Sequence, residues 1–445
     1  MQQFLKNFEQ GLIFQHLVKW TLFALPVSLG VGSMVALFLW LLDEATRYRM
    51  QYPWLLYLLP VAGILIFALY KYWGKGTEAG NNLILDEIHE PGGGIPFRMA
   101  PLVLITTVIT HLFGGSAGRE GTAVQIGGSI SHYVGNKFSL SPSDMQVILL
   151  CGIAAGFGAV FGTPVTGAVF ALEVLAIGAI RYNALVPCLI AAVLADIVLS
   201  AWGIHHTLYQ IQFQKNTFDL QAFLSTDFLL LVKVIGAGVA FGLVSQLFVR
   251  TSHAIKHLSN RYIPIKWLIP ALGGTIIIVM TSLLQTQDYL GLGVVPPVNG
   301  TVSITTAFGA DGATYFSWFW KLLFTAITLG MGFKGGEVTP LFFIGATLGN
   351  TIAVLTGAPI DLMAALGFIA VFAGATNTPL ACTIMGVELF GGEPILYFAV
   401  ACFTAYYFSG HTGIYSTQRL EISKLLRTEK EDLPVEEENK PFNHH

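Results

Sequence analysis

Apolar runs of about the length that crosses a bilayer recur along almost the whole chain, and they constrain its fold more than any other feature. A membrane-spanning helix needs about 20 mainly apolar residues. Residues 20–42, 145–172 and 338–360 are runs of that order, and we count about ten or more such segments in all. The sequence therefore predicts an all-α polytopic membrane protein that lies in a lipid bilayer.

The distribution of charge supports this class and excludes others. Only 11% of the residues are charged, against roughly 25% in an average soluble domain, and many of the charges lie in the segment 418–445. The net charge of -3 and the absence of a basic cluster argue against a nucleic-acid partner. We expect no cofactor and no metal, because the cysteines lie in apolar stretches without ligand spacing; they are Cys151, Cys188, Cys382 and Cys402.

Glycine and proline interrupt the apolar runs and cut several of them into pieces shorter than a bilayer. The chain has 48 glycines and 19 prolines. A broken helix leaves backbone groups without partners, which membranes tolerate where the break lines a cavity or binds a ligand. These breaks favour a transport protein, although glycine also permits close helix packing and that alternative stays open for any single glycine.

Two halves of the chain carry the same pattern of glutamate and proline. The segments PVTGAVFALE and PLACTIMGVE each follow a threonine and end in a glutamate, Glu173 and Glu388. Upstream of them, Glu120 and Glu337 lie in corresponding glycine-flanked breaks. The same order of features in both halves predicts a duplicated unit, which is typical of transporters that bind their substrate between the repeats.

The repeat and the polar interruption between its copies divide the chain into four segments. Residues 1–205 form the first membrane repeat, 206–227 a polar connection, 228–418 the second membrane repeat and 419–445 a charged tail. Basic residues soon after the last apolar run predict that this C-terminal tail lies in the cytoplasm. The N-terminal stretch lacks the pattern of a cleaved signal peptide, so we expect none.

Six ionisable residues stand out inside the apolar body, where a charge costs roughly 2.5 to 3.5 kcal/mol. For Glu173 and Glu388 we favour a structural role over a functional one. Glu120 and Glu337 differ, because each precedes an apolar run at a point where a helix would begin, and a helix N-terminus attracts anions. A carboxylate there can occupy the anion position and vacate it on protonation, and so act as both gate and proton carrier. The six are Arg119, Glu120, Glu173, Lys334, Glu337 and Glu388.

Several motifs resemble those of the CLC family of chloride channels and anion/proton antiporters. The run GREGTAVQ at 118–125 is similar to the family's GREGP motif, and Glu120 falls on its gating glutamate. The stretch GEVTP at 336–340 stands at the position of the GxFxP motif. The resemblance covers the body to about residue 418. It implies the CLC fold, with two inverted-topology repeats of tilted and broken helices, and a homodimer.

Departures from the family pattern indicate a particular branch. Asn81, in the run GNNLI, stands where the anion-coordinating serine is expected, while the literal match GGGIP at 92–96 is interpreted as a loop. Glu337 and Thr339 replace apolar residues, and Val174 stands at the position of the internal proton-transfer glutamate. These changes resemble the fluoride-transporting bacterial branch. The central tyrosine of the family corresponds to Tyr415.

The resemblance implies a fluoride/proton antiporter of the bacterial inner membrane that exports cytoplasmic fluoride, the alternative being a chloride/proton antiporter or a chloride channel. Glu120 would be the gate and proton carrier, Glu337 the proton relay, and Thr339 a hydrogen-bond donor to the gate or the anion. An intramembrane enzyme is disfavoured, since the chain has neither a GxSG elbow nor an HExxH pair. The expected anion-binding residues are Asn81, Tyr415, Thr339, Gly118 and Gly121.

Overall fold

The computed structural model describes residues 9–213, 228–297 and 301–424, and that part of the chain is almost entirely helical. Its only regular strands are two short ones, β1 (Ala176–Ile177) and β2 (Arg419–Leu420), which pair in parallel. The predicted all-α class is confirmed. The strand pair ties the end of the second half of the chain to the middle of the first.

The described residues contain both long and short apolar helices. Six are long and apolar enough to cross a membrane: 10–51, 53–73, 142–161, 182–201, 228–262 and 338–356. Six more apolar helices have 10–17 residues, fewer than the roughly 20 that one crossing requires. The interruption of membrane helices that the glycines and prolines predicted is therefore present.

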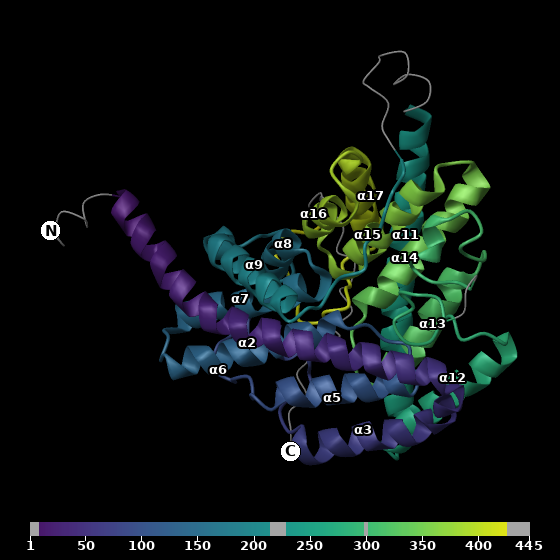
Figure 1. Cartoon of the computed structure of the whole chain (residues 1–445), viewed down its shortest axis with the longest axis horizontal. Coiled ribbons are helices and arrows are strands. Elements are labelled where there is room, and N and C mark those ends of the chain that lie inside the picture. Colours follow the sequence, from purple (N-terminus) through teal and green to yellow (C-terminus); the bar gives the residue numbers. More distant parts are fainter. Residues whose placement is uncertain (1–8, 214–227, 298–300, 425–445) are drawn as a thin grey trace, which may run out of the picture.

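The two halves of the chain are arranged as two groups of helices (Figure 1). In the first half the elements are α2 (Glu9–Gln51), η1 (Pro53–Leu58), α3 (Leu59–Trp73), α4 (Asn81–His89), α5 (Met99–Leu112), α6 (Glu120–Lys137), α7 (Pro142–Phe161), α8 (Pro164–Glu173), η2 (Tyr182–Ala184) and α9 (Leu185–Ala201). In the second half they are α11 (Phe228–Tyr262), α12 (Leu268–Leu284), η4 (Thr306–Phe308), α13 (Ser317–Gly330), α14 (Val338–Thr356), α15 (Ile360–Thr376), α16 (Pro379–Phe390) and α17 (Ile395–Phe408).

The same close helix contact recurs in both halves. A Cβ atom on Gly127 of α6 would lie 2.0 Å from the carbonyl oxygen of Gly152 in α7, and one on Gly345 of α14 would lie 1.9 Å from that of Gly367 in α15. Any side chain at Gly127 or Gly345 would force the two helices apart. Glycine therefore serves packing at these positions, and the equivalence of the two contacts agrees with the predicted duplication.

Helices α8 and α16 cap each other through the two glutamates of the repeat pattern. Glu173, at the end of α8, accepts hydrogen bonds at 2.7 and 3.0 Å from backbone N–H groups in the first turn of α16. Glu388, in α16, accepts two backbone N–H groups of α8 at 2.8 and 3.0 Å and the Thr166 hydroxyl at 2.6 Å. These contacts agree with the structural role favoured for both glutamates, although the partners are helix N-termini and not cations.

A cluster of phenylalanines joins the halves beneath these caps. Phe157 and Phe170 of the first half stack with ring centroids 4.3 Å apart, and Phe372 of α15 stacks on both at 6.1 and 5.8 Å. Phe342 of α14 meets Phe372 edge to face at 5.5 Å. All four side chains are buried, so apolar packing holds the repeats together around the segments that carry the polar residues described next.

Candidate anion site

The glycine-rich breaks of the two repeats meet directly. Gly118 and Gly336 form an isolated antiparallel bridge, in which each backbone N–H donates to the other residue's carbonyl oxygen at 2.6 and 2.9 Å. The bridge brings the beginning of α6 close to the beginning of α14. Two helix N-termini with backbone N–H groups that lack partners inside their own helices are thus brought together.

The carboxylate of Glu120 lies at the N-terminus of α14. Its Oε1 accepts the backbone N–H of Val338 at 2.5 Å. Its Oε2 accepts the backbone N–H and the hydroxyl of Thr339 at 3.2 and 3.0 Å, and the backbone N–H of Arg119 at 2.9 Å. Glu120 is 1% exposed. The Glu120 carboxylate therefore fills a nest of four donors, three of them from the first turn of α14.

Two glycines make room for that carboxylate. A Cβ atom on Gly336 would lie 2.0 Å from Oε1 of Glu120, and one on Gly118 would lie 2.7 Å from both carboxylate oxygens. Carbon and oxygen atoms that are not bonded cannot approach so closely. The carboxylate position consequently requires glycine on both sides, which gives Gly118 a steric function in the site.

Asn81 begins α4 and faces the start of α6. The N-cap of α4 is Gly80, with φ of 61°, and no side chain caps the helix, so Asn81 does not serve as its N-cap. A Cβ atom on Gly121 would lie 3.1 Å from Nδ2 of Asn81. The other amide atom, Oδ1, is buried without a hydrogen-bond partner. Since rotation of an amide exchanges oxygen and nitrogen, this buried position can present N–H donors to an anion.

Tyr415 is buried in the segment that follows α17, next to the start of α4. Asn82 of α4 donates to the Ser416 hydroxyl at 2.9 Å, which fixes the two segments to each other. Gln418 anchors the same segment by donating to the carbonyl oxygens of Val174 and Thr376 at 3.0 and 3.1 Å. Tyr415 lies within electrostatic range of the Glu120 and Glu337 carboxylates, so it belongs to the same region of the protein.

Glu337 is the N-cap residue of α14, and its side chain is half-buried. Within the described residues its carboxylate accepts no hydrogen bond, in contrast to Glu120. The charges of Glu120 and of Lys256, near the end of α11, act on it electrostatically. Glu337 is thus within electrostatic range of both Glu120 and a basic residue of α11.

The structure buries two basic side chains that were not among the predicted site residues. Lys321 of α13 is completely buried and donates to the carbonyl oxygens of Tyr289 and Gly291 at 3.2 and 2.7 Å. Arg49 of α2 is 4% exposed, and its Nε and Nη1 atoms have no hydrogen-bond partner. Lys321 was visible as a lone charge in an apolar run, whereas Arg49 follows the apolar run of α2 and resembled an ordinary helix-end residue.

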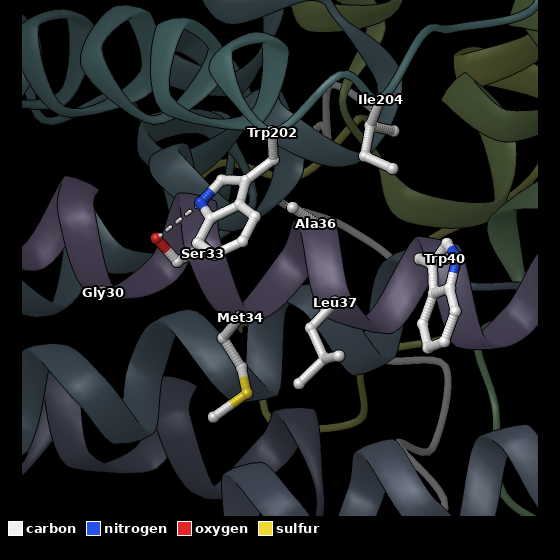
Figure 2. A pocket seen from close by; sticks show the side chains of 8 residues that line it. All are labelled: Gly30, Ser33, Met34, Ala36, Leu37, Trp40, Trp202 and Ile204. Carbon is white, nitrogen blue, oxygen red and sulfur yellow. Dashed lines mark hydrogen bonds between the residues drawn. The ribbon is translucent and has the colours of Figure 1, made fainter.

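A larger apolar cavity of about 490 Å³ lies elsewhere, between α2 and the end of α9 (Figure 2). Its one hydrogen bond between lining side chains joins Trp202 Nε1 to the Ser33 hydroxyl at 3.1 Å. None of the predicted site residues lines this cavity, so it is separate from the anion site. Its walls are Gly30, Ser33, Met34, Ala36, Leu37, Trp40, Trp202 and Ile204.

The arrangement around Glu120 suits an anion. Its groups are backbone N–H donors, a hydroxyl and an amide, and they converge where the broken helices of two repeats meet. Among the described residues no group of three histidine, cysteine or acidic side chains is placed to hold a metal ion. Fold and site together define a membrane protein of the anion-transporting class, with its site at the interface of two repeats.

Comparison with known proteins identifies the family. Residues 62–410 match the voltage-gated chloride channel family, and the chain belongs to this family, the CLC channels and antiporters. The chain is 46% identical over 431 residues to the "Chloride/fluoride channel protein" of Pseudomonas syringae pv. tomato, covering 96% of this chain and 92% of that protein. It is 27% identical to a putative ClcB-like chloride channel protein of Ralstonia nicotianae, over 81% of this chain and 83% of that protein.

Solved structures give the same result. A CLC-type fluoride/proton antiporter superposes with a TM-score of 0.83 at 34% identity, covering 91% of this chain and 98% of the other. A slow cyanobacterial Cl⁻/H⁺ antiporter superposes with a TM-score of 0.74 at 21% identity, over 89% and 96% of the two chains, which supports the fold. The family resemblance and the CLC fold predicted from the sequence are confirmed.

Proposed function

We propose that this CLC protein is a fluoride/proton antiporter that exports fluoride from the cytoplasm in exchange for protons, with protonation of Glu120 as its gate. One observation carries the proposal: the Glu120 carboxylate occupies a nest of donors at the N-terminus of α14. An ionised carboxylate there competes with a transported anion for the same N–H and O–H groups. Protonation removes the charge that holds it, and the nest becomes available to the anion.

The donors around the site support fluoride as the anion. Fluoride is small and strongly hydrated, so leaving water requires strong hydrogen-bond donors in exchange. The Asn81 amide, the Thr339 hydroxyl and the Tyr415 hydroxyl are such groups, and the backbone of Gly118 and Gly121 adds the close approach of a glycine-rich loop. Two similar proteins point the same way, one a CLC-type fluoride/proton antiporter and the other a chloride/fluoride channel protein.

A proton that arrives on Glu120 needs a way to the other side. Val174 has no group that can carry one. Glu337 is the candidate relay, because its carboxylate accepts no hydrogen bond from another described residue and the charge of Glu120 acts on it. In this cycle Glu120 moves between the outer solution and the anion site, Thr339 donates to its carboxylate, and Glu337 passes the proton inward.

The remaining parts of the proposal concern the setting of the protein. We assign it to the inner membrane of a bacterium, with the C-terminus in the cytoplasm and two copies in a homodimer. The basic residues that follow the last apolar segment support this orientation, and the family resemblance supports the dimer. The last segment, residues 425–445, lies outside the described residues.

Flux measurements on purified protein in liposomes test this function. The liposomes are loaded with fluoride or with chloride, and anion efflux and proton uptake are recorded together. We expect fluoride efflux accompanied by proton uptake in a fixed ratio, and much slower chloride efflux. Chloride efflux at a rate comparable to fluoride would contradict the assignment to fluoride, and fluoride efflux without proton uptake would contradict antiport.

A further inference from the structure

The polar connection between the repeats returns to the anion site directly after α9. Its residues His206, Thr207 and Tyr209 line a small cavity together with Arg119 and Thr339. Arg119 immediately precedes Glu120 in the chain, and Thr339 donates its hydroxyl to the Glu120 carboxylate. The beginning of the polar connection thus forms one wall of a cavity beside the proposed gate, Glu120. We call this space the connection cavity.

The connection cavity is the size of one small ion. Its volume of about 10 Å³ approaches the least that accommodates one water molecule, roughly 10–15 Å³. A fluoride ion is close to a water molecule in size, while chloride is larger. The remaining walls are apolar and complete the enclosure: Phe161, Val294, Phe342, Phe368 and Leu389.

Donors without partners surround the connection cavity. Arg119 Nε and His206 Nε2 are buried atoms that form no hydrogen bond. Within the described residues, the hydroxyl groups of Thr207 and Tyr209 form none either. Buried polar groups normally have partners, so the unpaired Arg119 Nε and His206 Nε2 beside one ion-sized space indicate a ligand that supplies the acceptor. The partly buried side chains of Thr207 and Tyr209 line the same space.

The wall of the connection cavity carries the positive charge of Arg119, and two acidic residues lie outside the cavity. Arg119 carries a guanidinium group, whose carbon lies 6.0 Å from the centre of the Phe161 ring. The carboxylate of Asp196 is 3.7 Å from His206 Nε2, beyond hydrogen-bond distance. Asp43 acts on Arg119 electrostatically without direct contact. Neither acidic residue lines the cavity, so its interior favours an anion.

The connection is held firmly enough to serve as a binding wall. A Cβ atom on Gly162 would lie 2.4 Å from Cδ2 of His206, so the imidazole ring packs directly on the glycine that ends α7. The ring of Tyr209 packs against Phe308 at 5.9 Å and Phe368 at 5.3 Å between centroids. The two polar side chains are therefore positioned by packing against both halves of the protein.

We propose that the connection cavity is a second anion site, which holds one fluoride ion beside the gate while the Glu120 carboxylate occupies the nest on α14. Arg119 supplies the charge, and His206, Thr207 and Tyr209 supply hydrogen bonds. Thr339 lies between the two sites and separates the waiting ion from the gate. This inference rests on the proposed function for the identity of the ion.

Titration calorimetry with sodium fluoride on the full chain in detergent tests the second site. The variants are His206→Leu, which removes a ring nitrogen donor, and Tyr209→Phe, which removes only a hydroxyl. His205→Leu is the matched control, because His205 is exposed and does not line the connection cavity. We expect each cavity variant to weaken fluoride binding at one site by about tenfold or more and the control to bind like the unaltered protein.

Flux in liposomes separates this inference from the proposed function. We expect a higher KM for fluoride in the two cavity variants, with an unchanged ratio of fluoride to protons. Fluoride affinity and KM like those of the unaltered protein in Tyr209→Phe and in folded His206→Leu would overturn the second site alone. If the unaltered protein moves no fluoride with protons, the proposed function itself fails.

Discussion

Replacement of Thr339 by valine removes one hydrogen-bond donor to the Glu120 carboxylate, the proposed gate, and changes little else. Threonine and valine have the same shape, and the Thr339 backbone N–H stays in place. The substitution removes the 3.0 Å hydrogen bond from the Thr339 hydroxyl to Oε2 of Glu120. Three of the four donors to the carboxylate remain, so we expect the carboxylate to keep its position but to hold it less tightly.

The size of the effect follows from the type of hydrogen bond. A hydrogen bond to a charged group contributes about 1.5–3 kcal/mol, and each 1.4 kcal/mol is about a tenfold change in an equilibrium. Thr339→Val should therefore lower, by about tenfold or more, the ratio of the ionised carboxylate's population in the nest to its population outside the nest. Fluoride can then pass without protonation of Glu120.

The assay is simultaneous recording of fluoride efflux and proton uptake from liposomes. We expect Thr339→Val to move more fluoride per proton than the unaltered protein. Thr339→Ser is the control, because it keeps the hydroxyl and should keep the ratio. An unchanged ratio in folded Thr339→Val protein would refute the conclusion that this hydroxyl holds the gate.

Three further predictions concern other acidic and amide side chains. Glu337→Gln should weaken coupling, and an unchanged fluoride-to-proton ratio would exclude Glu337 as the relay. Glu173→Gln and Glu388→Gln should each lower stability by about 1–3 kcal/mol, because each leaves the N–H groups of a helix start with a weaker acceptor. Thermal unfolding in detergent measures this change, and a variant that loses transport without losing stability would contradict the capping role. Asn81→Ser should raise chloride efflux relative to fluoride efflux, and unchanged selectivity would exclude the amide as a determinant.

The central elements of the site could be predicted because they depend on local sequence. A glutamate in a glycine-flanked break before an apolar run predicts a carboxylate at a helix start, and Glu120 is found there. The helix that its carboxylate contacts is a different one, since Glu120 is the first residue of α6 and its side chain binds the start of α14. Its contact with Val338 arises only when the two repeats are assembled.

The contacts between the two repeats could not be predicted from the sequence. The pattern that marked Glu173 and Glu388 did not say that each caps the other's helix, because both glutamates end similar apolar runs and neither is near its partner in the chain. In the same way, the sequence indicated only that the connection between the repeats is polar. That His206 packs on Gly162 depends on the path of the chain after α9, which no local motif encodes.

Proton uptake by a variant without the gating carboxylate is the most direct test of the account. Liposomes that contain Glu120→Gln are loaded with fluoride, and proton entry is recorded during fluoride efflux. Glu393→Gln is the matched control, because Glu393 is exposed at the start of α17. We predict that proton uptake is abolished in Glu120→Gln and retained in the control. Persistent proton uptake coupled to fluoride in Glu120→Gln would contradict the assignment of Glu120 as gate and proton carrier.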